Sequence, residues 1–196
     1  GFMGLIYNYI ILDNHDIITI SKDGYTSKNL YITKPTNMVA ICDSPDPYKH
    51  WTIKEINDQP KSIMAATNNG ARILNNNIIL GGLNQLKELL KTSKFDHLIV
   101  LGCGTSYHAS MFSKYYFNSS SLNTFTSIQA FDASEFCKND IPKSGKVLCI
   151  VCSQSGETHD LIKCIDICKK RDCFLIGIVN VVDSLISRSV DCGVYL

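Results

Sequence analysis

The sequence predicts an α/β protein built on a parallel five-stranded sheet with helices on both faces. From Asp96 onward, short apolar segments alternate regularly with segments of helical character. The apolar segments, such as HLIVLG and KVLCIVC, are nearly continuous, which is typical of strands buried on both faces. Parallel strands require crossover connections, and helices between the strands supply them.

The first 50 residues differ from the rest. Residues 1–35 are β-rich and contain Asp23-Gly24, a hairpin turn signal. Thirty-five residues are too few to form a core of their own, so we interpret this segment as the C-terminal strands of a truncated domain. Residues 36–50 include Pro45 and Pro47 and are predicted to be a linker. Residues 51–196 are predicted to be the main domain.

That domain is expected to begin with helices. WTIKEINDQ and PKSIMAAT indicate two short helices, with Pro60 in the first turn of the second. LNQLKELLK indicates a third helix with Leu83, Leu86, Leu89 and Leu90 on one side.

The region of alternating apolar and helical segments after Asp96 is predicted to form the sheet. Strands are predicted over the apolar segments 97–102, 124–131, 146–152, 174–180 and 192–196. Helices are predicted from Ser106 to about Phe117, over 133–138, from Glu157 to about Lys170, and over 184–189. The crossover rule and the flavodoxin-like order 2-1-3-4-5 place the first and third strands side by side.

Composition excludes several classes of function. The chain has 196 residues with 19 Lys and Arg against 18 Asp and Glu, so no excess of positive charge indicates nucleic-acid binding. Its apolar runs are shorter than the about 20 residues that span a bilayer, and the N-terminus lacks a signal-peptide pattern. We expect a cytoplasmic protein that binds neither nucleic acid nor membrane.

The nine cysteines are predicted to be core residues. Their number is odd and no secretion signal accompanies them, so a disulfide framework is not expected. Cys149 and Cys152 point to opposite faces of a strand and therefore cannot bind one metal together. Cys164 and Cys168 share an apolar helix stripe with Leu161. We expect no metal and no other cofactor.

Two loops carry the predicted chemistry. GCGTS (102–106) follows the first strand of the sheet and SQSGET (153–158) follows the third, and each precedes a helix. Ligands of open parallel sheets bind beyond the carboxyl ends of the strands, where the strand order reverses, and helix N-termini attract anions. The candidate binding residues are Thr105, Ser106, Ser153, Gln154, Ser155, Gly156 and Thr158.

These residue types favour a phosphate monoester held by hydroxyls and backbone N–H groups. A nucleoside triphosphate site would need G-x-x-x-x-G-K-[ST], which is absent, and the third glycine of a dinucleotide-binding motif is replaced by Tyr107. The alternative is that the hydroxyls only cap the helices. His108 and His159 are weaker candidates for ligand contact, and Cys103 is a weaker candidate for a reactive thiol. Glu157 is a weaker candidate for a general base, because a carboxylate in the first turn of a helix is favoured to complement the helix dipole.

These motifs resemble the glutamine:fructose-6-phosphate amidotransferase family (glucosamine-6-phosphate synthases), in particular its eukaryotic type. LGCGTSYHA and SQSGET resemble its two sugar-phosphate loops. KEINDQP, LGGL, ASEF and SLISRSVDCGV follow the family order, so the resemblance covers roughly residues 50–196.

The resemblance implies a first SIS (sugar isomerase) domain, preceded in residues 1–35 by the end of a glutaminase domain. It also implies synthesis of glucosamine 6-phosphate from fructose 6-phosphate and glutamine, for UDP-N-acetylglucosamine biosynthesis. Carried over by motif, Thr105 and Ser106 match the first loop, and Ser153, Gln154, Ser155 and Thr158 match the second. The implied partners are a hexose 6-phosphate and, at full length, a second copy in a homodimer.

The sequence departs from the family at both ends. The family's glutaminase half begins with a catalytic cysteine, whereas this chain begins Gly1-Phe2-Met3 and has its first cysteine at Cys42. It ends at Leu196, before the second SIS domain with its acid–base and Schiff-base residues. We expect no catalytic residue in this chain and no turnover by it alone. The alternatives are a lone SIS-domain phosphosugar sensor and a sugar-phosphate isomerase without amide transfer.

Overall fold

The computed structural model describes residues 6–13, 15–35, 44–121 and 124–196. The chain divides into two compact units, Gly1–Asp58 and Gln59–Leu196. The boundary falls inside helix α1 (Trp51–Ala66). No helix among the described residues is both long and apolar enough to cross a membrane.

The first unit is β-rich, as predicted. Strands β2 (Ile18–Ser21) and β3 (Gly24–Ser27) form an antiparallel hairpin in which Ser21 pairs with Gly24. The two turn residues are therefore Lys22 and Asp23, one position before the expected dipeptide. A second antiparallel pair joins β1 (Asn8–Tyr9) to β4 (Lys34–Pro35).

The predicted linker is only partly within the described residues. Residues 36–43, which include Cys42, lie outside them, as do the first residues of the chain. Residues 44–50 form turns and bends without a helix or strand.

Helix α1 is continuous where two short helices were predicted. Pro60 lies in its interior rather than in the first turn of a second helix. A proline there removes a single backbone hydrogen bond and adds strain in one turn. Helix-favouring residues on both sides, such as Glu55 and Met64, continue the same coil across it.

A short hairpin follows that the sequence analysis did not predict. Strands β5 (Ile73–Leu74) and β6 (Asn77–Ile78) are antiparallel. The connecting Asn75 and Asn76 have φ of 48° and 61°. Positive φ at both central residues is the geometry of a hairpin turn, and asparagine tolerates it.

The leucine-rich segment forms η1 (Gly81–Leu83) and α2 (Asn84–Leu90). Leu83, Leu86 and Leu89 pack against the core, as predicted. Leu90 does not, because its side chain is 51% exposed. It lies at the edge of the apolar stripe, where the helical repeat turns it toward solvent.

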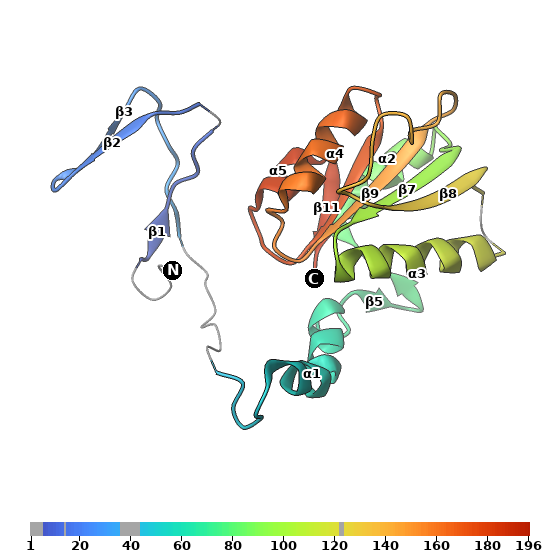
Figure 1. Ribbon diagram of the computed structural model, residues 1–196, viewed down its shortest axis with the longest axis horizontal. Coiled ribbons are helices and arrows are strands. Elements are labelled where there is room, and N and C mark those ends of the chain that lie inside the picture. Colours follow the sequence, from blue (N-terminus) through green and yellow to red (C-terminus); the bar gives the residue numbers. More distant parts are fainter. Residues whose placement is uncertain (1–5, 14, 36–43, 122–123) are drawn as a thin grey trace. The chain divides into compact units, whose positions relative to one another are not determined.

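The central sheet matches the prediction. Its five strands are all parallel: β7 (His97–Gly102), β8 (Ser127–Asp132), β9 (Val147–Ser153), β10 (Phe174–Val179) and β11 (Cys192–Tyr195). Their spatial order is β11-β10-β9-β7-β8. Counted from β7, this is the order 2-1-3-4-5, and β7 and β9 are neighbours at the reversal (Figure 1).

Helices cover both faces of the sheet (Figure 1). α4 (His159–Lys169) and α5 (Leu185–Ser189) pack on one face over Leu101 and Val151. α2 and the C-terminal part of α3 (Thr105–Ser119) pack on the other, over Leu98 and Val100. The alternation of buried strand residues between two core clusters explains why the strands are apolar throughout.

The predicted helix at 133–138 is a set of turns instead. Asp132 Oδ1 accepts hydrogen bonds from the Ser134 backbone N–H at 3.0 Å and from the Ser134 hydroxyl at 2.8 Å. Asp140 Oδ2 accepts one from the Cys137 backbone N–H at 2.8 Å. Such side-chain bonds to the backbone compete with helix formation, which explains the error.

The cysteines tested by the structure behave as core residues. Cys149 and Cys152 belong to the two opposite faces of the sheet, as expected from their spacing. Cys164 and Cys168 lie on the buried face of α4, in the same cluster as Leu161. Cys137 is the exception, because it is exposed in the turns after β8.

Candidate functional site

A cavity of about 260 Å³ opens at the carboxyl ends of β7 and β9. These strands pair directly, with Leu101 opposite Val151, so the loops that follow them meet at the reversal of strand order. Nine residues line the cavity: Cys103, Thr105, Ser106, Cys152, Ser153, Gln154, Ser155, Thr158 and Leu161. Six of the seven predicted binding residues are among them, and Gly156 is not.

The hydroxyls of the second loop form a connected group. Ser153 Oγ lies 3.2 Å from Thr158 Oγ1 and accepts a hydrogen bond from the Gly156 backbone N–H at 3.0 Å. Ser155 Oγ accepts one from the Glu157 backbone N–H at 3.2 Å. The loop's backbone N–H groups at 156 and 157 are therefore engaged by serine oxygens. Ser155 keeps a hydroxyl proton that it can donate to a ligand, and in the Ser153–Thr158 pair either hydroxyl can be the donor, which leaves the proton of the other for a ligand.

Thr158 occupies the N-cap position of α4 without capping it. Its backbone is extended, as an N-cap requires, but its side chain makes no cap hydrogen bond with the described residues of the helix. The hydroxyl pairs with Ser153 at the cavity wall instead. For Thr158, the alternative that its hydroxyl only caps the helix is wrong.

Gly156 shapes the loop from behind the cavity. Its φ is +67°, a conformation that side chains of L-residues rarely adopt. Ser184, which is only 2% exposed, lies directly against it, so that a β-carbon at position 156 would overlap the serine side chain. Protein atoms behind the loop therefore exclude a side chain at position 156.

The weaker candidates do not gain support. Neither His108 nor His159 is among the described residues that line the cavity. Glu157 Oε1 accepts a hydrogen bond from the Leu185 backbone N–H at 2.8 Å, and the residue does not line the cavity, which does not favour a general base. Cys103 does line it, but burial and the nearby Asp132 carboxylate raise the pKa of its thiol. A reactive thiolate at Cys103 is therefore disfavoured.

Sequence reasoning missed two residues of the cavity. Cys152 precedes Ser153 at the end of β9, and Leu161 lies one helical turn after Thr158. Burial raises the pKa of the Cys152 thiol, so it contributes as a neutral side chain. These residues give the polar cavity an apolar side. The sequence signal that could have found them is their position close to the loop hydroxyls along the chain.

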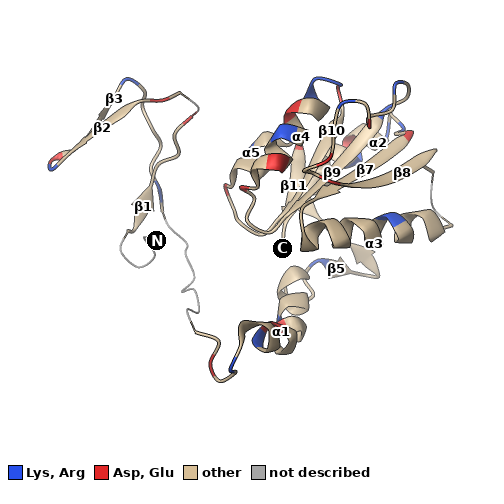
Figure 2. Cartoon of the chain, viewed as in Figure 1, with Lys and Arg blue, Asp and Glu red and all other residues tan. Residues whose placement is uncertain are grey.

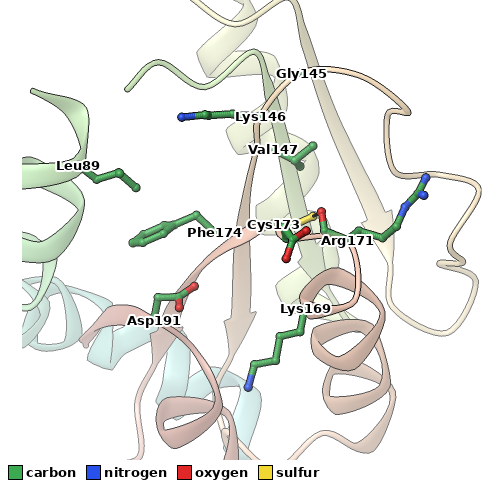
Figure 3. Close-up of a pocket in the computed structure, with 10 residues that line it drawn as sticks. Leu89, Gly145, Lys146, Val147, Lys169, Arg171, Cys173, Phe174 and Asp191 are labelled. Carbon is green, nitrogen blue, oxygen red and sulfur yellow. Dashed lines mark hydrogen bonds between the residues drawn. The ribbon is translucent and has the colours of Figure 1, made fainter. Parts of the chain in front are cut away.

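A larger depression of about 600 Å³ lies at the opposite edge of the sheet, where β9 and β10 begin (Figure 3). Its three cations, Lys146, Lys169 and Arg171, point away from one another in Figure 3. Lys146 Nζ donates to Ser93 Oγ at 2.9 Å. Because these charges do not converge, we place the candidate site at the smaller cavity.

An open parallel sheet with a hydroxyl-lined cavity at the reversal of strand order defines an α/β domain of the kind that binds ligands at that position. The chain belongs to the SIS domain family, whose model matches residues 91–196.

Two relatives, each 36% identical to this chain over the matched residues, carry the same enzyme name. The chain is 36% identical over 200 residues to the probable glutamine–fructose-6-phosphate aminotransferase (isomerizing) of Acanthamoeba polyphaga mimivirus, over 100% of this chain and 32% of that protein. It is 36% identical over 146 residues to glutamine–fructose-6-phosphate aminotransferase (isomerizing) 2 of Homo sapiens, over 73% of this chain and 20% of that protein. The chain thus spans a third or less of the length of these relatives.

A solved structure shows the same fold. The C-terminal domain of glucosamine-fructose-6-phosphate aminotransferase from Francisella tularensis superposes with a TM-score of 0.65 at 30% sequence identity. The match covers 78% of this chain and 41% of that one.

Proposed function

We propose that this chain is the sugar-phosphate-binding part of an enzyme that makes glucosamine 6-phosphate from fructose 6-phosphate and glutamine. The names of its relatives support this reaction over a lone sensor or a plain isomerase. The cavity between β7 and β9 then holds the phosphate of the hexose 6-phosphate.

The observation that carries the proposal is the orientation of Thr158. Its hydroxyl stands at the start of α4, makes no cap bond there, and joins Ser153 at the cavity wall. Hydroxyls so placed have protons to donate to an anion. Helices α3 and α4, which have 15 and 11 residues, both begin at this edge of the sheet. The positive ends of their dipoles there favour an anion.

The binding roles divide between the two loops. Thr105 and Ser106 donate from the loop after β7. Ser153, Ser155 and Thr158 donate from the loop after β9, and Gln154 contributes its amide. Among the described residues that line the cavity none is Lys or Arg, so the phosphate, with about −1.5 to −2 charges near pH 7, is held by neutral donors.

The remaining assignments extend the same proposal. The first unit represents the last strands of a glutaminase domain. The full-length enzyme is a cytoplasmic homodimer that supplies UDP-N-acetylglucosamine biosynthesis. The acid–base groups of the isomerisation come from parts of the enzyme other than this cavity.

Binding measurements test the proposal directly. Calorimetry or ligand-observed NMR compares fructose 6-phosphate, glucosamine 6-phosphate and free fructose. We expect both phosphates to bind and fructose to bind far more weakly. Equal binding of fructose and fructose 6-phosphate contradicts the proposal.

The matched substitutions are Thr158→Ala and Thr19→Ala. A hydrogen bond to a charged group contributes roughly 1.5–3 kcal/mol, so Thr158→Ala should weaken binding by about tenfold to a hundredfold. Thr19 is exposed on β2 in the first unit and serves as the control. Unchanged binding by Thr158→Ala means that its hydroxyl does not contact the phosphate.

A further inference from the structure

The beginning of α5 contacts the back of the second loop through two backbone N–H groups. Leu185 donates to Glu157 Oε1 at 2.8 Å, and Ile186 donates to the Gly156 carbonyl at 2.9 Å. Ser184, buried immediately before them, packs on Gly156. We call these three interactions the α5 contact.

The α5 contact bears on the hydroxyls that face the cavity. The peptide group between Gly156 and Glu157 supplies both its carbonyl, to Ile186, and its N–H, to Ser155 Oγ. The Gly156 N–H binds Ser153 Oγ. Holding this peptide from behind therefore fixes the orientation of the two serine side chains in front.

From this geometry we infer that Glu157 is a positioning residue of the phosphate loop, acting through its hydrogen bond to Leu185. This inference rests on the proposed function, since it concerns the same cavity. The carboxylate ties the loop to the start of α5 and so holds Ser153 and Ser155 ready to donate to the phosphate.

The same hydrogen bond also controls an unfavourable charge. A carboxylate one residue from Thr158 repels a phosphate dianion if it approaches the cavity. Bound to the Leu185 N–H, the carboxylate stays outside the set of cavity-lining residues. Loss of this hydrogen bond would have two effects together, because it would loosen the loop and leave the negative charge of Glu157 free to approach the ligand.

Three substitutions separate positioning from a role for the charge. Glu157→Gln keeps an oxygen acceptor at the same reach and removes the charge, so we expect fructose 6-phosphate to bind within about twofold of the unsubstituted chain. Glu157→Ala removes the acceptor, and binding should weaken about three- to tenfold. Glu157→Asp keeps the charge but is one methylene too short, so it should bind no better than Glu157→Ala. A role for the negative charge itself in binding predicts the reverse order of Gln and Asp.

The experiment is calorimetry with fructose 6-phosphate on the 196-residue chain, together with hydrogen exchange at the Leu185 amide. Exchange should be faster in the Ala and Asp variants and unchanged in the Gln variant. The control is Glu88→Ala, which removes an exposed glutamate paired with Lys91 on α2 and should alter neither reading. Melting temperatures verify that the variants are folded.

Two results overturn the inference: binding by Glu157→Ala equal to that of the unsubstituted chain, or loss of binding by Glu157→Gln as large as that by Glu157→Ala. If the unsubstituted chain itself fails to bind fructose 6-phosphate, the proposed function is wrong. In that case Leu185 exchange still decides whether Glu157 holds the loop to α5, since it needs no ligand.

Discussion

Gly156 and Ser184 pack so closely that neither position tolerates a larger side chain. Gly156 has φ of +67°, and a β-carbon there would overlap both side-chain atoms of Ser184. Ser184 is 2% exposed, and its hydroxyl has no hydrogen-bond partner among the described residues. The pair joins the loop after β9 to the start of α5, so its packing determines the back of the candidate site.

Gly156→Ala should therefore destabilise the chain by roughly 2–5 kcal/mol, since left-handed strain costs about 1–2 kcal/mol and overpacking about 1–3 kcal/mol. Gly104→Ala is the control, because Gly104 also has positive φ, +55°, but a β-carbon there meets no described atom within 4 Å. It should show the strain alone. Urea unfolding measures both, and adding Ser184→Gly should restore the overpacking part of the Gly156→Ala loss. A Gly156→Ala loss that Ser184→Gly does not reduce contradicts this account.

Stability should fall at alkaline pH because of the buried thiols. Burial raises the pKa of Cys164 to about 12. Contact with Cys149 raises the pKa of Cys168, and contact with Cys168 raises that of Cys173. The unfolded value is about 8.5. Because the folded pKa is the higher one, the stabilisation is complete below about pH 8.5 and is lost as the pH rises toward the folded value.

Urea unfolding under reducing conditions between pH 7 and 10.5 tests this expectation. Each such thiol should lower the unfolding free energy by up to about 1.4 kcal/mol per pH unit above pH 8.5. Cys164→Ala should make the decline shallower, whereas Cys137→Ala, at an exposed thiol, should leave its slope unchanged. A flat profile for the unsubstituted chain means that the thiols ionise equally in both states.

The sheet was predictable because its signals are local and repeated. Each strand is a continuous apolar run, and the order of the strands follows from the crossover rule. The helix expected at 133–138 failed because Asp132 and Asp140 bind backbone N–H groups of the turn, a competition that periodicity does not report. Pro60 was read as a boundary, although one lost hydrogen bond does not end a helix with favourable neighbours.

The candidate site, like the fold, could be predicted only in part from the sequence. Its front was predictable, since hydroxyls directly after two neighbouring strands must meet at one edge of the sheet. Its back was not. Ser184 and Leu185 lie about 30 residues after the loop, and nothing in their residue types indicates contact with Gly156 and Glu157. Such contacts depend on how β10 returns the chain beside β9, which only the folded structure specifies.

The outward face of α3 should promote self-association. Four large side chains are exposed on it, Met111, Phe112, Tyr115 and Tyr116, with exposures between 48% and 72%. The helix contains a single Lys or Arg and no Asp or Glu, and it is almost uncoloured in Figure 2. Exposed apolar patches of this kind favour association.

Sedimentation velocity over a range of concentrations should therefore detect species larger than the 21.8 kDa monomer. Phe112→Lys combined with Tyr116→Lys should shift the population toward monomer. Leu30→Lys, at a fully exposed position of the first unit, is the matched control and should leave it unchanged. A monomer at every concentration, with the unsubstituted α3, contradicts the prediction.

Substitution of Ser153 and of Ser155 by alanine should change the stability of the chain by different amounts but weaken phosphate binding to a similar extent. Ser153 is 6% exposed, and its oxygen accepts the hydrogen bond of the buried Gly156 N–H. Ser153→Ala leaves that N–H without its acceptor, which costs about 1–3 kcal/mol. Ser155 is exposed, so water replaces its bond to the Glu157 N–H, and Ser155→Ala should change stability by less than about 0.5 kcal/mol.

Both serines line the cavity, so both substitutions should weaken fructose 6-phosphate binding by about tenfold or more. Calorimetry gives the affinities and urea unfolding the stabilities of the same preparations. Ser119→Ala, at an exposed hydroxyl near the end of α3, controls for loss of a surface serine. If Ser155→Ala binds normally, the phosphate does not contact the exposed side of the loop. If Ser153→Ala keeps full stability, the Gly156 N–H has found another acceptor, and the hydroxyl of Ser153 contributes to the ligand alone.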